Sequence, residues 1–140
     1  PLMCRPSSVS PTPTRGIPPR LTGWLMLRGE ILLVDLEPAR AGEADKRRPA
    51  VIVSNDNANA TAARLGRGVV TVVPVTSNIA RVYPFQVLLP ADETGLHVDS
   101  KAQAEQVRSV SVERIGPVTG RIPTHLLTQL DDALRLHLHL

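Results

Sequence analysis

Short apolar runs separated by turn-forming residues recur along the chain from position 30 onward. The runs are rich in Val, Ile and Leu, and Pro, Gly, Asn or Asp stands near most of their borders. Runs of this length and composition predict β-strands. We therefore expect five strands, over residues 30–36, 50–54, 69–75, 85–89 and 103–112.

Two segments have the pattern of helices instead. Residues 55–65 hold several alanines and begin at a capping Asn55 or Asp56. A second helix is expected over roughly residues 123–138, because Pro123 suits a first turn and leucines recur at spacings of three and four. This stripe comprises Leu126, Leu127, Leu130, Leu134 and Leu138. The order of elements predicts a mainly β, α+β fold, a small antiparallel barrel or strongly bent sheet with a C-terminal helix.

The first 25 residues differ from the rest of the chain. They hold six of the 13 prolines, with serines and threonines between them. Proline removes backbone donors and disfavours helix. We therefore expect residues 1–25 to form a disordered or polyproline-like tail, and residues 26–140 to form one domain.

The formal net charge of +3 comes from the tail alone. Residues 1–25 carry Arg5, Arg15 and Arg20 and no acid, so the remaining 13 basic residues balance all 13 acidic ones. A balanced domain does not have the basic surface of a duplex-DNA-binding protein. Any nucleic-acid site must be a local patch.

The scarcity of aromatic and cysteine residues restricts the possible core, binding mode and compartment of the protein. One Trp, one Tyr and one Phe leave an aliphatic core and little capacity to stack nucleobases. The single cysteine, Cys4, excludes an internal disulfide and fits a reducing compartment. No apolar run has the length of a membrane span or of a signal-peptide core, so we expect a cytoplasmic protein.

The candidate chemistry lies where two predicted strands meet loops. Glu43 and Arg48 belong to a charged loop that enters the strand at position 50, and Thr76 and Ser77 follow the strand that ends at Val75. A guanidinium, a carboxylate and two hydroxyls at strand ends are suited to holding a phosphodiester. The alternative is a solvated charge run and a hydroxyl that caps a turn.

Several segments, taken in order, resemble the MazF/PemK family of toxin endoribonucleases. The resemblance covers about residues 27–140. It rests on Arg28-Gly29-Glu30-Ile31, Val34-Asp35-Leu36-Glu37-Pro38, the 43–48 loop with Arg48-Pro49-Ala50-Val51-Ile52-Val53-Ser54, Val73-Pro74-Val75-Thr76-Ser77, Tyr83-Pro84-Phe85 and Ala104-Glu105-Gln106-Val107-Arg108-Ser109.

This resemblance implies a homodimeric SH3-like barrel of about five to seven strands. It implies sequence-specific cleavage of single-stranded RNA without metal or other cofactor, to 2′,3′-cyclic phosphate and 5′-hydroxyl ends. It also implies a MazE-like antitoxin whose C-terminal segment fills the RNA groove. A toxin of this kind would inhibit translation and growth.

Cleavage of this type needs a base for the 2′-hydroxyl, stabilisation of charge on phosphorus and an acid for the 5′-oxygen. Arg48 is the candidate for stabilising this charge, because a guanidinium stays protonated. Donation of a proton to the 5′-oxygen is its second candidate role. Glu43 is the candidate base, and Thr76 the candidate hydroxyl donor. The four histidines form no evident pair for this chemistry, since three of them lie on or after the last helix.

Residues around these three are expected to contact RNA or to line its groove. Gln106 and Arg108 are two apart, so on a strand they would share one face. Tyr83-Pro84-Phe85 is expected to close a turn and fill the core. His137 and His139 point in different directions on a helix and indicate no metal site. The RNA-contact candidates are Ser77, Lys46, Gln106, Arg108, Asn78 and Arg81.

Two other functions are compatible with the same fold. A gyrase poison resembling CcdB would act through an aromatic residue near its C-terminus, but the chain ends Leu138-His139-Leu140 and Trp24 is its only tryptophan. A catalytically silent module that binds RNA or antitoxin is the other alternative, because geometry rather than sequence decides catalysis.

Overall fold

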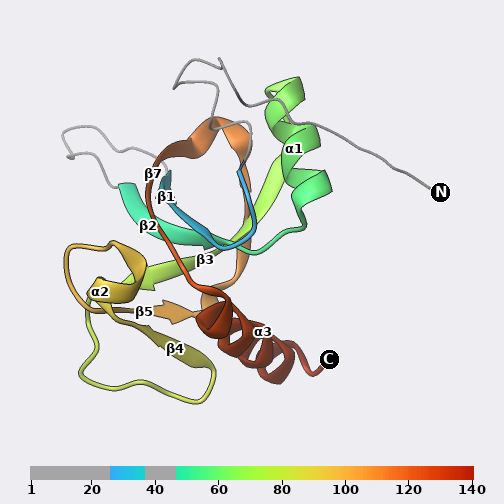
Figure 1. The fold of residues 1–140 in the computed structure, drawn as a ribbon. Helices are drawn as coiled ribbons and strands as arrows, with labels where there is room; N and C mark the ends of the chain where they lie inside the picture. Colours follow the sequence, from blue (N-terminus) through green and yellow to red (C-terminus); the bar gives the residue numbers. More distant parts are fainter. Residues whose placement is uncertain (1–25, 37–46) are drawn as a thin grey trace, which may run out of the picture.

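The computed structural model describes residues 26–36 and 47–140 (Figure 1). The predicted tail over residues 1–25 lies outside the described residues. The strands are β1 Glu30–Asp35, β2 Arg47–Ile52, β3 Val69–Thr76, β4 Gln86–Leu89, β5 Ser100–Gln103, β6 Arg108–Ser111 and β7 Ile115–Arg121. The helices are α1 Asp56–Leu65, α2 Ala91–Thr94 and α3 Thr124–Leu138, with short 3-10 turns η2 Ala104–Gln106 and η3 Val112–Arg114.

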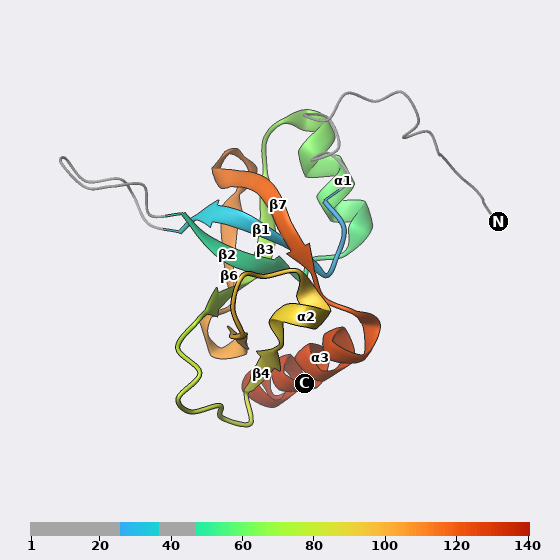
Figure 2. The same cartoon turned by 60° about the vertical axis from the view of Figure 1, so that its left-hand side comes forward.

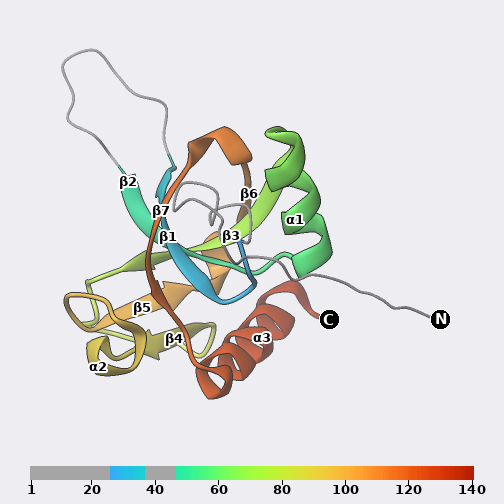
Figure 3. The ribbon, with the colours of Figure 1, turned by 45° about the horizontal axis from the view of Figure 1, so that its top comes forward.

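All strand pairings are antiparallel, and the seven strands form one bent sheet. The order along the sheet is β4-β5-β3-β2-β1-β7, and β6 also pairs with β3. On one edge β3 pairs with β2, and on the other its first half pairs with β6 and its end with β5. The sheet therefore curls around itself, as the view in Figure 3 shows. The predicted barrel-like α+β fold with a C-terminal helix is confirmed.

The central strands are buried on both faces. One core joins alternate residues of β1, β2 and β3 to α3 and includes Ile31, Val51 and Leu130. The other joins the intervening residues to α1 and includes Leu32 and Ile52. The two long helices accordingly lie on different sides of the sheet (Figure 1). Burial on both faces explains why these strands are continuous apolar runs rather than alternating ones.

The strand boundaries correct the sequence-based prediction in two places. β2 begins at Arg47, three residues before the predicted start, because residues 47–51 pair with β1. The predicted strand over residues 103–112 is wrong as a single element. It is divided by η2, where the Val107 amide donates to the Ala104 carbonyl at 3.1 Å.

The sequence did not predict α2 or β7, and the predicted burial of Tyr83-Pro84-Phe85 is wrong. Residues 84–85 do form a turn, but Tyr83 is exposed and Phe85 is half-buried. Within β7, a Cβ on Gly116 would lie 2.8 Å from the Leu33 carbonyl oxygen. Glycine here permits the close approach of two strands.

A buried hydrogen-bond network attaches α1 to the sheet. Asn59 is fully buried, and its side-chain amide donates to the Ser54 carbonyl at 2.9 Å. The Ser54 hydroxyl donates to Asn59 Oδ1 and accepts from the Thr71 amide at 3.1 Å. The network thus connects the residues after β2, the helix and β3.

We expect Asn59→Ala to lower the free energy of unfolding by about 1–3 kcal/mol, because it leaves partly buried polar groups of Ser54 without their partner. Urea denaturation followed by far-ultraviolet circular dichroism measures the change. Asn57→Ala is the matched control, since Asn57 is exposed on the same helix. Equal unfolding midpoints for the two variants would contradict the role assigned to the network.

Candidate functional site

Arg48 occupies the second position of β2, where it pairs with Val34 of β1. The sequence predicted a loop at this position, but the backbone of Arg48 is part of the sheet. Its side chain is exposed, whereas the next residues are half-buried at Pro49 and buried at Ala50. Backbone pairing therefore fixes the position of the Arg48 Cα atom, from which the exposed guanidinium extends.

Thr76 ends β3 and pairs with Lys101 of β5. Its hydroxyl oxygen accepts a hydrogen bond from the Asn78 amide at 3.2 Å, and Asn78 Oδ1 accepts one from the Ala80 amide at 3.3 Å. The Thr76 hydroxyl therefore does cap the following turn. Because it acts there as an acceptor, its proton is still available to a ligand.

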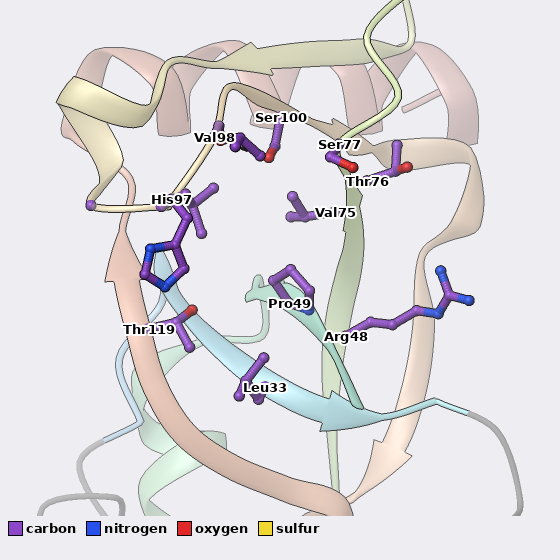
Figure 4. Close-up of a pocket in the computed structure, with 12 residues that line it drawn as sticks. Leu33, Arg48, Pro49, Val75, Thr76, Ser77, His97, Val98, Ser100 and Thr119 are labelled. Carbon is purple, nitrogen blue, oxygen red and sulfur yellow. Dashed lines mark hydrogen bonds between the residues drawn. The ribbon is translucent and has the colours of Figure 1, made fainter. Parts of the chain in front are cut away.

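The start of β2 and the end of β3 both border one pocket of about 380 Å³. Arg48, Thr76 and Ser77 all line it, and in Figure 4 the guanidinium extends on the side where the two hydroxyls lie. Much of the rest of the wall is apolar, with Leu33, Pro49, Val75, Leu96 and Val98. A wall of this kind lowers the local polarity beside a cation, which strengthens its interaction with an anionic ligand.

The opposite side of the pocket carries polar groups that were not predicted from the sequence. His97 and Thr119 lie there, side by side and across the pocket from Arg48 in Figure 4, whereas Ser100 lines the pocket beside Ser77. Gly95 ends α2 with φ 84°, and a Cβ there would lie 3.8 Å from the Gly120 Cα of β7. This close approach brings the His97 loop to β7. No local sequence signal reports such a contact.

The remaining predicted site residues are dispersed. Glu43 and Lys46 lie outside the described residues. Gln106 ends η2 while Arg108 begins β6, so the prediction that they share one strand face is wrong. Both are exposed, and neither lines the pocket.

Asn78 and Arg81 belong to the loop between β3 and β4. Both are exposed, and neither lines the pocket. The side-chain oxygen of Asn78 holds a turn, as described above, whereas Arg81 donates to the Tyr83 hydroxyl at 3.3 Å.

The chemistry available in the pocket is that of a cation with adjacent hydroxyls. Across residues 26–36 and 47–140, no three His, Cys, Asp or Glu side chains come together as a metal site. Over the same ranges, no helix has the length and apolarity to cross a bilayer. A guanidinium and hydroxyl donors beside an apolar wall are suited to binding a phosphate group.

Comparison with known proteins gives consistent matches over the described fold. The model of a family described as PemK-like, MazF-like toxin of type II toxin–antitoxin system matches residues 27–138. The chain is 67% identical over 116 residues to Endoribonuclease MazF9 of Mycobacterium tuberculosis, covering 83% of this chain and 98% of the relative.

Two solved structures from Deinococcus radiodurans have the same fold. A crystal structure of MazF matches with a TM-score of 0.63 and 26% identity, over 81% of this chain and 96% of the other. A crystal structure of MazE-MazF matches with a TM-score of 0.61 and 25% identity, over 80% and 93%.

Proposed function

Because the chain belongs to the PemK-like, MazF-like toxin family of type II toxin–antitoxin systems and is an endoribonuclease, we propose that it cuts single-stranded RNA at short recognition sequences. The reaction needs no metal ion and leaves 2′,3′-cyclic phosphate and 5′-hydroxyl ends. One observation carries the proposal: Arg48 and Thr76, from the ends of two strands, line the same pocket.

In the proposed reaction the 2′-oxygen forms a bond to phosphorus while the bond from phosphorus to the 5′-oxygen breaks. A base removes the 2′-hydroxyl proton, and the leaving 5′-oxygen gains a proton. Glu43 is our candidate for the base. Arg48 stabilises the negative charge that develops on the phosphate oxygens, and the Thr76 hydroxyl donates to one of them.

We assign RNA contact to the polar residues of the surrounding loops and strand ends. Single-stranded RNA presents phosphates and unpaired base edges, which cations, amides and hydroxyls recognise. The assigned residues are Ser77, Lys46, Asn78, Arg81, Gln106 and Arg108.

We further propose that two copies of the chain form a homodimer and that a MazE-like antitoxin blocks its RNA site. The exposed apolar side chain of Val98 supports association, since it is 55% exposed and a second copy that packs beside it would leave the pocket open as part of a shared RNA groove. Sedimentation equilibrium measures the mass of the assembly. We also propose that the protein acts in the cytoplasm, where its cleavage of RNA inhibits translation and growth.

The function is tested with the purified full chain, a long single-stranded RNA and EDTA, followed by mapping of the new ends. Discrete cuts that leave 5′-hydroxyl ends are expected, and the bases around them give the recognition sequence. A folded protein that cuts none of several RNAs would contradict the proposal and favour a gyrase poison or a silent binding module. Cleavage that EDTA abolishes would refute the metal-independent mechanism.

Replacement of the Thr76 hydroxyl gives a prediction for the mechanism. We expect Thr76→Val to slow single-turnover cleavage about 10- to 100-fold, because it removes one hydrogen bond to a charged phosphate. Thr76→Ser keeps the hydroxyl, both as a donor to phosphate and as an acceptor for Asn78, and serves as the control. Cleavage by Thr76→Val at the wild-type rate would remove Thr76 from the mechanism.

A further inference from the structure

Two buried side chains clamp the loop that follows Thr76. Lys101 is 7% exposed, and its Nζ donates to the Arg81 carbonyl at 2.6 Å. Gln86 is 8% exposed, and its Oε1 accepts from the Tyr83 amide at 3.1 Å. The β3–β4 connection leaves the sheet as a long loop and returns at β4 (Figure 2). Its last part is therefore held in place although it lies at the surface.

This clamp lies directly beside the candidate cleavage pocket. Lys101, whose ammonium group holds the loop, is the strand partner of Thr76. Thr76 carries the proposed catalytic hydroxyl. Gln86 is itself held, because its Nε2 donates to Glu105 Oε2 at 2.7 Å. The position of the clamped segment relative to the pocket is thus set by the sheet.

The clamped segment presents two of the three aromatic rings of the chain. Tyr83 and Phe85 stack in parallel, with ring centroids 5.3 Å apart and an interplanar angle of 4°. Tyr83 is 41% exposed. Two cations lie over its ring, with Arg81 Cζ at 5.8 Å and Lys101 Nζ at 5.9 Å from the centroid. An exposed aromatic pair with adjacent positive charge is a combination that many proteins use to bind single-stranded nucleic acids.

We propose that Tyr83, supported by Phe85 and flanked by Arg81, is a stacking site for one nucleobase of the RNA strand that enters the pocket. This inference rests on the proposed function and adds a base-binding subsite to it. The exposed Arg81 side chain can leave the ring for a phosphate, since a cation–π contact in water is weaker than the stacking of a base on an aromatic ring. The scarcity of aromatic residues thus does not prevent base stacking.

The test measures binding separately from cleavage. The probes are fluorescein-labelled ten-nucleotide oligomers of deoxythymidine and of deoxyadenosine, which lack the 2′-hydroxyl and cannot be cut by the proposed route. Fluorescence anisotropy with the full chain gives the dissociation constants. We expect Tyr83→Leu to weaken binding about 5- to 100-fold, because a base loses its stacking partner.

Two control variants test whether weaker binding results from loss of the aromatic ring or from another effect of substitution. Tyr83→Phe keeps the ring and loses only the hydroxyl that accepts from Arg81, so binding within about two-fold of wild type is expected. Leu88→Ala removes an exposed apolar side chain of the neighbouring β4 and is expected to leave binding unchanged. Circular dichroism establishes that each variant is folded.

The outcomes distinguish this inference from the proposed function. A wild-type protein that cuts long RNA while Tyr83→Leu binds both probes like wild type would overturn the stacking site alone. A wild-type protein that binds the probes through Tyr83 but cuts no RNA would support the stacking site and contradict the proposed activity. A folded wild-type protein that binds neither probe, or a Tyr83→Phe variant as weak as Tyr83→Leu, would overturn the inference.

Discussion

Replacement of Arg48 by alanine is expected to slow RNA cleavage by about 10²- to 10³-fold and to leave the fold intact. Among the described residues that line the pocket, Arg48 is the only Lys or Arg, and in the proposed mechanism its guanidinium faces the oxygens on which charge develops. The pocket has an apolar wall, which makes the lost interaction larger than it would be in water. The rate is measured under single-turnover conditions on an RNA that contains a mapped cut site.

Two variants control for the loss of a charge. Arg48→Lys keeps the charge but not the planar pair of donors, so an intermediate rate is expected if the guanidinium contacts two phosphate oxygens. Arg64→Ala removes an exposed arginine from the last turn of α1 and is expected to cleave normally. Because Arg48 is exposed and belongs to neither core, its alanine variant should change the free energy of unfolding by less than about 0.5 kcal/mol.

A wild-type cleavage rate for Arg48→Ala would mean that the pocket is not the active site. A rate loss accompanied by an unfolding midpoint as low as that of a core variant would instead indicate that Arg48 supports the fold. The assignment of charge stabilisation requires a slow, folded variant.

Elements whose ends are specified locally were predictable from the sequence. The prediction of α1 is confirmed because Asn55 caps its start by accepting from the Ala58 amide at 2.8 Å, and Gly66 ends it with φ 69°. Both signals lie within one turn of the helix end. β3 likewise follows from a long run of β-branched residues, most of them buried.

Elements defined by distant contacts were not predictable. Gly116 and Gly120 are typical of a turn when read alone, yet both lie in β7, where they let this strand approach the Leu33 and Thr94 carbonyls. The division of residues 103–112 likewise depends on pairing, because β5 and β6 are held by different parts of β3. The pattern of one sequence does not identify the distant residues that contact these glycines or the strand that pairs with β5 and β6.

The same distinction applies to the site. Arg48, Thr76 and Ser77 were recognisable because each adjoins or begins a β-type run, and the structure brings these three residues to one pocket. His97 and Lys101 were not recognisable, because their positions depend on α2, β7 and the partner strand β3. Residues that adjoin a recognisable β-type run were thus found from sequence, and residues whose place depends on α2, β7 or a partner strand were not.

The attachment of α3 gives the second large expected effect. Leu130 is fully buried and belongs to the core that joins this helix to β1, β2 and β3. We expect Leu130→Ala to lower the free energy of unfolding by about 2–5 kcal/mol, because the substitution removes buried methyl groups and leaves a cavity. Urea denaturation at a fixed protein concentration measures this change, since an associating protein unfolds at a midpoint that depends on concentration.

Leu136→Ala is the matched control, because it makes the same substitution in the same helix at a side chain that is 59% exposed. Its effect should stay within about 0.5 kcal/mol of wild type in the monomeric fold. A large loss at Leu136 together with a small one at Leu130 would mean that α3 buries the opposite face against a second copy of the chain. Equal small losses would mean that the helix contributes little to the core, and that the sheet and α1 stabilise the fold alone.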